Sequence, residues 1–405
     1  MSGIRALSKY WLYTEDFAQD PYPYWEKVRT EEPVREVKAP DGTRSWVVSR
    51  YPDVRPLLAD QRLSRDINRL YAVMSRQLGR EYKPDPELSN HLVDVDPPRH
   101  TRLRKQLTGT FTKRRTELMR PAIEEIADGL LDRLAESDQP DLVTGLASPL
   151  PIMAVAELLG VPKTDWADFD RWSATLLRTD ASDESGILDE TVGEVSAYMR
   201  SLIRRKRADP QDDLMSALIH AEDEERLDDG EVLSTCIALM TGGNQTTVGL
   251  LGGGALALLQ HPEQAAQLRA DPSLWPTAVE ELIRYVTPVN CALKRVTKEP
   301  ITVGDVTIPA DEVVILSITS ANRDEQHFVD DPSRFDITRK RITHVSFGHG
   351  IHFCSGAHLA RLEIEAAFSR MLTRFPKIRL DIDESDIRYH RDIFVRAVVS
   401  LPVTL

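Results

Sequence analysis

Cysteine is scarce in this chain, which excludes a small fold held together by disulfides. The 405 residues hold three cysteines, Cys236, Cys291 and Cys354, and their spacing does not form a disulfide framework. No repeat, low-complexity segment or Gly/Ser linker divides the chain. The N-terminal residues lack an apolar run long enough for a signal peptide or a membrane anchor. We therefore expect a cytoplasmic protein in a reducing compartment, with no membrane partner.

Positive charge is also in deficit. Lys and Arg together number 51 against 64 Asp and Glu, which gives a formal net charge of -13 at pH 7. This balance favours solubility and argues against a general nucleic-acid binder. The hydrophobic content of 41% and the charged content of 28% are ordinary for a soluble globular protein. We expect one globular domain over residues 1–405, acting as a monomer without nucleic acid.

The hydrophobic pattern predicts a mainly α fold with a smaller β-rich region. Asp41-Gly42 and Gly304-Asp305 each separate two short β-type runs, which is typical of hairpins. The polar, arginine-rich stretch Arg62–His91 is expected to be a long loop. The helical body is expected at about 97–286 and 355–375, and the β-rich part at about 30–60, at 290–320 and in strands near the C-terminus, including Phe394–Leu401.

Cys354 lies in an unusual neighbourhood. It belongs to the stretch Phe347-Gly348-His349-Gly350-Ile351-His352-Phe353-Cys354-Ser355-Gly356, which an amphipathic helical pattern follows. Gly350 and Gly356 allow the backbone to approach a flat group closely. A helix N-terminus lowers the pKa of a thiol just before it, and an aromatic such as Phe347 shields the sulfur from water. These features favour a thiolate ligand of haem iron.

Two other interpretations of Cys354 stay open at this point. Zinc binds Cys and His together, and His349, His352 and His358 lie close by in sequence, although without the two separated ligand pairs of structural zinc sites. A buried, inert cysteine is the third interpretation, because free cysteine is among the most buried residue types.

Three further stretches carry candidate functional residues. Glu281 and Arg284 are three apart on an expected helix and can pair. His100 and Arg104 share one face of a helix that begins near Pro97-Pro98. The glycine pair Gly242-Gly243 lies inside a long helical pattern and indicates close approach or local distortion there. Taken singly, each stretch also has an ordinary structural explanation. The first is typical of a surface ion pair, the second of solvated charges and the third of a helix–helix contact.

Taken together and in this order, these stretches resemble the cytochrome P-450 superfamily. The pattern Phe347-x-x-Gly350-x-x-x-Cys354-x-Gly356 is similar to its haem-binding loop. The resemblance implies the cytochrome P-450 fold, with a long central helix over the haem, and it implies haem b with Cys354 as the axial ligand of iron. It also implies propionate donors at four positions: His100, Arg104, Arg295 and His352.

The same resemblance assigns roles on the central helix and in the proximal core. Gly243, Gln245 and Thr246 match the oxygen-activation stretch, although the family usually has an acid where this chain has Gln245. Glutamine cannot ionise but can orient water. Glu281 and Arg284 match a structural pair that locks to an arginine of the following meander, for which Pro332-Ser333-Arg334-Phe335 offers Arg334.

The implied activity is that of a haem-thiolate monooxygenase. It would insert one oxygen atom from O2 into a small to medium organic substrate, by hydroxylation or epoxidation, in secondary-metabolite biosynthesis. A ferredoxin-type donor with an NAD(P)H-dependent reductase would supply the electrons. Oxidative coupling, peroxide-driven oxidation and a non-catalytic haem binder are the alternatives. By family position, the substrate would meet the central helix and four other segments: Arg62–His91, Leu177–Leu188, Val289–Leu293 and Ile393-Phe394.

Overall fold

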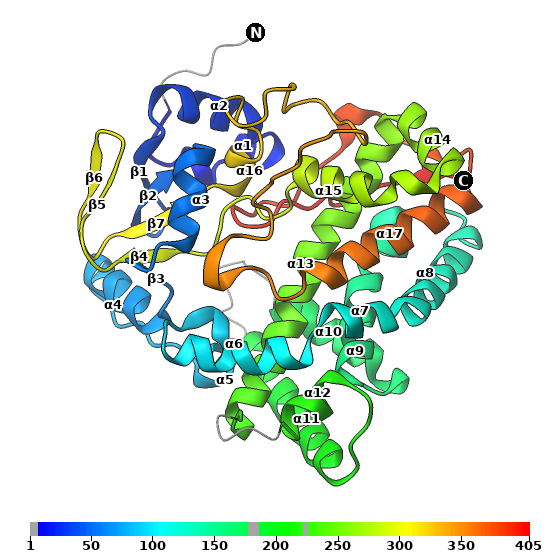
Figure 1. The fold of residues 1–405 in the computed structure, drawn as a ribbon, viewed down its shortest axis with the longest axis horizontal. Coiled ribbons are helices and arrows are strands. Elements are labelled where there is room, and N and C mark those ends of the chain that lie inside the picture. Colours follow the sequence, from blue (N-terminus) through cyan, green and yellow to red (C-terminus); the bar gives the residue numbers. More distant parts are fainter. Residues whose placement is uncertain (1–6, 177–185, 222–225) are drawn as a thin grey trace. The chain divides into compact units, whose positions relative to one another are not determined.

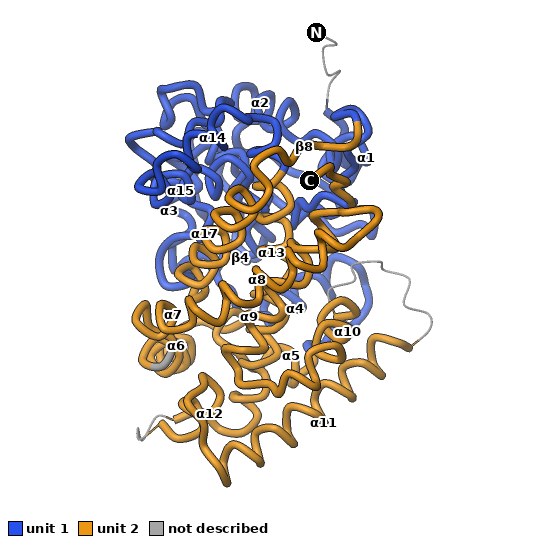
Figure 2. The backbone as a smooth tube through the Cα atoms, turned by 90° about the vertical axis from the view of Figure 1, so that its right-hand side faces the viewer, with its two compact units in different colours: residues 1–84, 256–354, 383–399 blue, residues 85–255, 355–382, 400–405 orange. Residues whose placement is uncertain are grey.

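The computed structural model describes residues 7–176, 186–221 and 226–405. Contacts gather the chain into two compact units, each assembled from separate stretches of sequence (Figure 2). Unit 1 comprises residues 1–84, 256–354 and 383–399, and unit 2 comprises residues 85–255, 355–382 and 400–405. The single-domain organisation expected from the sequence stays a prediction.

Unit 1 contains the five-stranded sheet and the hairpin of β5 and β6, whose strands are labelled in Figure 1. Its elements are η1 (Trp11–Tyr13), α1 (Glu15–Gln19), α2 (Tyr22–Glu31), β1 (Val34–Lys38), β2 (Arg44–Val48), α3 (Tyr51–Ala59), β3 (Leu63–Ser64), α4 (Ile67–Leu78), α14 (Pro262–Ala270), η5 (Pro272–Leu274), α15 (Trp275–Val286), β4 (Arg295–Thr297), β5 (Ile301–Val303), β6 (Val306–Ile308), β7 (Val313–Leu316), α16 (Ile318–Ala321), η6 (Gly350–His352) and η7 (Glu384–Asp386).

Unit 2 is almost entirely helical. Its elements are α5 (Pro86–Ser89), η2 (Leu92–Asp94), α6 (Arg99–Thr110), α7 (Lys113–Leu118), α8 (Arg120–Ala135), the π-helical turn η3 (Val143–Ala147), α9 (Pro149–Leu159), η4 (Lys163–Asp165), α10 (Trp166–Leu176), α11 (Ile187–Ala208), α12 (Leu214–Ile219), α13 (Asp229–Gln260, whose last turn belongs to unit 1), α17 (Ala357–Arg374), β8 (Arg379–Leu380) and β9 (Val403–Thr404).

The sheet of unit 1 has five strands in the order β1-β2-β7-β4-β3. β1 and β2 form the antiparallel hairpin expected around Asp41-Gly42, with Val34 opposite Val48. β7 joins β2 in parallel and carries β4 antiparallel on its other side. β5 and β6 form the second expected hairpin. This arrangement places Arg295, the first residue of β4, in the sheet itself.

An aromatic cluster fills the core under the N-terminal helices of unit 1. The Trp11 and Trp25 rings meet edge to face with centroids 4.9 Å apart, and Phe17 packs edge-on against each of them. All three side chains are almost fully buried. Aromatic side chains of this size dominate the energy of a core, so the cluster fixes α1 and α2 against the sheet.

The mainly helical class with a small β-rich region, expected from the sequence, is confirmed. Two local expectations are wrong. The stretch Arg62–His91 is not a loop, because it contains β3, α4 and α5. Asp66 caps α4 by accepting from the Asn68 amide, Gly79 ends it with a φ of +66°, and buried Leu70 and Val73 face the core. The polarity of Arg62–His91 comes in part from charged side chains on the face of α4 that points away from the core.

The second error concerns the C-terminal strands. Phe394–Leu401 forms isolated bridges at Val395 and Val398 rather than a strand, and the paired strand β9 begins at Val403. Side-chain caps interrupt regular pairing here, since Asp392 accepts hydrogen bonds from the amides of Phe394 and Val395. Among the described residues, no helix is long and apolar enough to cross a membrane.

Helix α17 buries a carboxyl group against α8 and α9. Glu363 is 1% exposed, and its Oε1 finds no hydrogen-bond partner among the described residues. Burial raises the pKa of Glu363 well above its ordinary value, because a low-dielectric surrounding disfavours the charged form. The neutral acid is therefore the form that the fold holds.

We expect Glu363→Gln to stabilise the protein increasingly as pH rises. A raised folded-state pKa means that the stability of the neutral acid is complete below the unfolded-state pKa and is lost as pH rises toward the folded-state pKa. Thermal unfolding at pH 5 and pH 8.5 should show a variant advantage that grows by about 1 kcal/mol or more. Glu365→Gln, whose carboxylate faces Arg120 at 3.2 Å, is the control. An equal trend in both variants contradicts the prediction.

Candidate active site

The loop before α17 is shaped by glycines with a left-handed backbone. Gly348 and Gly350 have φ values of +73° and +79°. A Cβ atom on Gly350 would lie 2.7 Å from the Cα of Ala59 in α3, so no other residue fits this position. The Cys354 amide donates to the Phe347 carbonyl at 2.9 Å and closes the turn. The glycine conformations and the packing of Gly350 on Ala59 together set the backbone around Cys354.

The three cysteines differ in accessibility. Cys354 is exposed, whereas Cys236 and Cys291 are buried. Burial raises the pKa of Cys236 to about 12 and raises the pKa of Cys291 as well, so both hold their protons. The inert-cysteine interpretation thus describes Cys236 and Cys291, and Cys354 is the thiol that a cofactor can reach.

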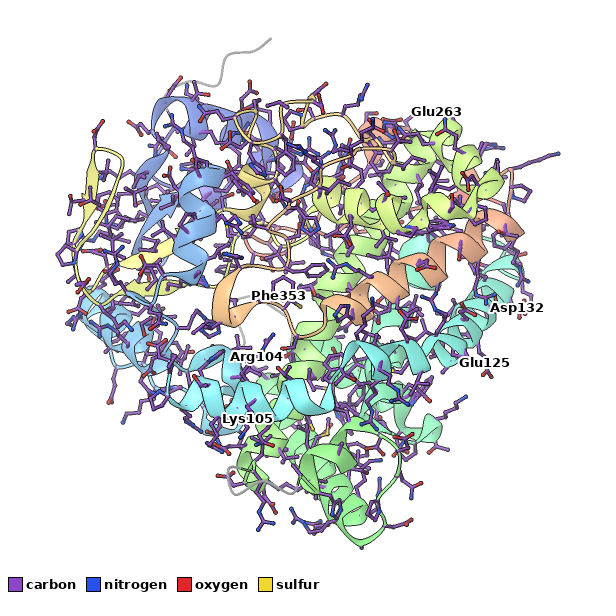
Figure 3. All side chains as sticks on the ribbon, in the orientation of Figure 1. Arg104, Lys105, Glu125, Asp132, Glu263 and Phe353 are labelled. Carbon is purple, nitrogen blue, oxygen red and sulfur yellow. The ribbon has the colours of Figure 1, made fainter. Side chains whose placement is uncertain are left out.

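The surroundings of Cys354 suit a flat, apolar ligand with acidic edges. Ile351 and Phe353, on either side of His352, expose 37% and 40% of their surface. Phe353 is labelled in Figure 3. Within the described residues, no group of three or more His, Cys, Asp or Glu side chains is arranged to hold a metal ion, which leaves the zinc interpretation without support. An exposed thiol beside exposed apolar side chains fits haem.

The four expected propionate donors are distributed over the two units. In unit 1, Arg295 is 5% exposed and donates to the Leu58 carbonyl at 3.3 Å, and His352 lies half-buried in η6. In unit 2, Arg104 of α6 donates to Ser355 Oγ at 2.7 Å. Sequence reasoning missed Ser355. Its position directly after Cys354 was the only available signal.

His100 is the most buried of these donors, with 2% of its surface exposed. Burial, with the nearby Arg104 guanidinium, holds the pKa of His100 below its ordinary value. The ring is therefore neutral at pH 7, and it can donate one N–H without adding charge.

The oxygen-activation stretch lies in the middle of α13. Thr246 Oγ1 donates to the Gly242 carbonyl at 2.9 Å, and Thr241 Oγ1 donates to the Ile237 carbonyl at 3.0 Å. A Cβ atom on Gly243 would lie 2.8 Å from a methyl of Val155 in α9. Packing of α13 on α9 is thus a sufficient reason for that glycine. Gln245 is partly exposed beside Thr246.

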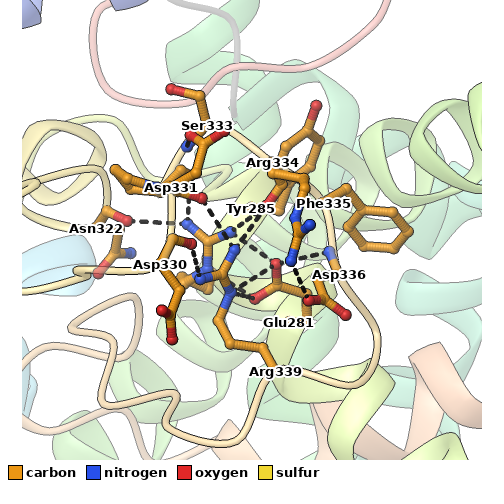
Figure 4. Close-up of polar contacts among 12 residues, drawn as sticks. Glu281, Tyr285, Asn322, Asp330, Asp331, Ser333, Arg334, Phe335, Asp336 and Arg339 are labelled. Carbon is orange, nitrogen blue, oxygen red and sulfur yellow. Dashed lines mark hydrogen bonds and ion pairs between the residues drawn. The ribbon is translucent and has the colours of Figure 1, made fainter.

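Glu281 and Arg284 form the centre of a buried ionic cluster. Glu281 and Arg339 of this cluster are labelled in Figure 4. The side chains of Glu281 and Arg284 are 0% exposed, and two hydrogen bonds of 2.7 Å join them. The Arg284 guanidinium also donates to the carbonyls of Asn322, Pro332 and Arg334 at 3.1, 2.8 and 3.2 Å. The pair therefore anchors the extended segment that leads to the Cys354 loop.

The arginine that joins this pair is Arg339, not Arg334 as expected. Arg339 Nε lies 3.2 Å from each carboxylate oxygen of Glu281. The Arg334 side chain is 62% exposed and pairs with Asp336, while its carbonyl accepts from Arg284 and Arg339. The reason is geometric: the backbone of Arg334 turns its carbonyl inward, and its side chain consequently points to solvent.

The substrate-facing segments expected from family position are only partly described. Residues 177–185 of Leu177–Leu188 lie outside the described residues. Val289–Leu293 and Ile393-Phe394 lie side by side in unit 1, since the Asn290 amide donates to the Phe394 carbonyl at 2.7 Å. Leu293 exposes 51% of its surface.

An accessible cysteine in a glycine turn before a helix is compatible with the class of haem-thiolate proteins, in which a Cys thiolate holds the haem iron. The sequence model for cytochrome P-450 matches residues 152–396, more than half of the chain. Cytochrome P-450 107B1 from Saccharopolyspora erythraea is 43% identical, over 96% of each chain. The mycinamicin IV hydroxylase/epoxidase of Micromonospora griseorubida is 40% identical, over 93% of this chain and 94% of its own.

Solved structures agree with these sequence relatives. The bacillaene polyketide synthase cytochrome P-450 PksS of Bacillus subtilis superimposes with a TM-score of 0.89 at 36% identity, covering 97% of this chain and 99% of its own. The chain belongs to the cytochrome P-450 family, and it is a monooxygenase that incorporates oxygen from O2. The family implies a haem-thiolate cofactor.

Removing the Arg339 side chain should destabilise the protein far more than removing that of Arg334. Arg339→Ala leaves Glu281 with one cation and several buried carbonyls without a donor, which costs about 3–5 kcal/mol. Arg334→Ala removes an exposed pair worth about 1 kcal/mol or less. Urea unfolding of the two variants gives the comparison. Equal losses would mean that Arg339 is not the partner of Glu281.

Proposed function

We propose that this protein hydroxylates or epoxidises a medium-sized secondary metabolite, with haem b held by Cys354. The observation that carries the proposal is the exposed Cys354 thiol in a turn that Gly350 makes possible. Bound haem supplies the oxidation chemistry, since a thiolate ligand donates electron density that favours O–O cleavage. The residues of the chain bind and orient the haem and the substrate, and they deliver protons.

Four side chains are proposed to hold the haem carboxylates. Arg295 and Arg104 supply charge, and the neutral His100 ring supplies an N–H, with His352 as the fourth donor. Hydrogen bonds to the Leu58 carbonyl and to Ser355 Oγ support this role, because they hold the two guanidiniums in fixed orientations. Charge-assisted bonds to carboxylates are roughly twice as strong as neutral ones.

Thr246 is proposed to hold the proton that the reaction consumes. Its hydroxyl donates to the Gly242 carbonyl at rest, and rotation about the side chain would turn that proton toward an acceptor outside the helix. Gln245 cannot replace the proton by ionising. Its amide would instead orient water beside Thr246, so the proton supply would come from solvent. Gly243 is proposed to leave room beside this pair.

The substrate class rests on apolar surface and on the relatives. Leu293 is a half-exposed apolar side chain two residues before Arg295, and Ala292 and Val289 of the same segment are partly buried. One relative is named for mycinamicin IV, and another, 38% identical over 97% of this chain, for 6-deoxyerythronolide B. A polyketide-type or similar metabolite with an apolar body fits these walls.

Electrons are proposed to come from a ferredoxin with an NAD(P)H-dependent reductase, to a monomeric protein in the cytoplasm. The rival mode, oxidation or coupling driven by peroxide, needs neither protein. Incubation of the enzyme with a mycinamicin IV probe under each regime separates the two. Product that requires ferredoxin and reductase supports the proposal, and product formed equally with peroxide alone contradicts it.

Replacing Cys354 should abolish the thiolate-type spectrum. The reduced, CO-bound wild-type protein should show the red-shifted Soret band of thiolate-ligated haem, and Cys354→Ala should lose it completely. Cys236→Ala, which removes a buried thiol, is the control and should keep the band. A band typical of histidine-ligated haem in the wild-type protein, or its survival in Cys354→Ala, would overturn the assignment.

Replacing the Thr246 hydroxyl should uncouple electron use from product formation. Thr246→Val keeps the shape of the side chain but removes the proton, and product per NADH consumed should fall by about tenfold, the value of one hydrogen bond. Thr241→Val on the same helix removes an equivalent hydroxyl and should keep the wild-type ratio. If both variants lose coupling equally, the effect belongs to the helix and not to Thr246.

A further inference from the structure

Asn290 is a buried amide in which every polar group is used. It is 2% exposed and lies in the Val289–Leu293 segment of unit 1. Its main chain donates to the Phe394 carbonyl at 2.7 Å and accepts from the first amides of α16, those of Ile318 and Thr319, at 3.0 and 3.2 Å. A residue with all groups satisfied in one arrangement has a fixed position.

The side chain of Asn290 joins two elements that are far apart in sequence. Its Nδ2 donates to the Ile393 carbonyl at 3.2 Å, and its Oδ1 accepts from Trp25 Nε1 at 3.0 Å. The indole N–H can only donate and a carbonyl can only accept. An amide satisfies both partners at once, whereas aspartate would lose the bond to Ile393 and leucine would lose both bonds.

Trp25 gives this amide a rigid base. The indole is 0% exposed and packs edge to face against Trp11 and Phe17, with centroids 4.9 and 5.7 Å away. Rings held on several sides do not leave their rotamers without disturbing the core. The direction of the Trp25 N–H, and with it the orientation of the Asn290 amide, is therefore set by the aromatic cluster.

Without this amide, main-chain bonds are what join the two segments. Val289 and Val395 form an isolated bridge, and the Arg396 amide donates to the Pro288 carbonyl at 2.8 Å. The Asn290 main-chain amide also donates to the Phe394 carbonyl, but none of these main-chain contacts involves the Ile393 carbonyl. Asn290 Nδ2 is the side-chain group that ties the Ile393 carbonyl to Val289–Leu293.

We propose that Asn290 and Trp25 form a positioning pair that sets the spacing between Val289–Leu293 and Ile393-Phe394, and thereby decides which ligands fit against them. The proposal rests on the proposed function, because these segments face the substrate only if that function holds. Neither residue touches the reacting atoms. Their effect passes through the main chain of the two segments.

Trp25→Phe tests the pair with a matched control. It keeps the aromatic ring and removes only the N–H and part of the ring surface. Trp11→Phe makes the same change in the same cluster, at a residue that is 1% exposed and whose Nε1 finds no acceptor among the described residues. Asn290→Asp, which deletes the donor to Ile393, is a second variant if it folds.

Hydrogen exchange provides the first measurement, because it does not depend on turnover. Amide protection in peptides covering 288–294 and 390–396 should fall by roughly fivefold or more in Trp25→Phe, since a buried acceptor has lost its donor. Trp11→Phe should leave that protection unchanged. Unchanged protection in Trp25→Phe, or an equal fall in both variants, overturns the pair.

Binding of two iron-ligating probes provides the second measurement. 4-Phenylimidazole carries an apolar ring that imidazole lacks, so the comparison of the two isolates contacts made beyond the iron-ligating ring. The ratio of their dissociation constants should change by roughly threefold or more in Trp25→Phe and stay constant in Trp11→Phe. Loosened exchange with an unchanged ratio overturns the specificity role. Absence of the thiolate Soret band in the wild-type protein would instead overturn the proposed function, so the two failures are distinguishable.

Discussion

The order of unit 1 depends on the buried ion pairs of the Glu281 carboxylate. This carboxylate pairs with two guanidinium groups, those of Arg284 and Arg339, and all three side chains are nearly or fully excluded from solvent. Ions taken out of water cost several kcal/mol each unless their remaining donors and acceptors are satisfied. Here the extra positive charge is spread over main-chain carbonyls, which ties an otherwise irregular segment to α15.

From this cluster, hydrogen bonds reach the loop of Cys354. The main-chain carbonyl of Asn322 accepts from Arg284. The side-chain amide of Asn322 accepts from the Val345 amide and donates to Ser346 Oγ at 2.7 Å. Two residues after Val345, Phe347 closes the turn around Cys354. A ligand on a loop is precise only when the loop is over-determined by its supports. The ionic cluster supplies that support for the thiol.

A second buried amide, Asn290, joins Val289–Leu293 to Ile393-Phe394, as Asn322 joins the Glu281 cluster to the loop of Cys354. Asn322 acts through bonds to nearby loops, whereas Asn290 is oriented by Trp25, 265 residues away in sequence. In both cases one uncharged side chain offers a donor and an acceptor in a fixed geometry. In unit 1, carboxylate and guanidinium groups therefore stabilise the core, and the two amides fix the positions of loops.

The sequence by itself determined the features whose causes are local. The Cys354 turn, the two hairpins and the class of fold follow from glycine conformation, turn residues and hydrophobic period within short windows. The sequence did not predict α4, because the many polar residues of Arg62–His91 outweigh the narrow apolar face of this helix. Tertiary structure alone decided that Arg339 and not Arg334 meets Glu281, and that Trp25 orients Asn290. Such pairings depend on which groups long-range packing brings together and deprives of water, and no spacing along the chain records that.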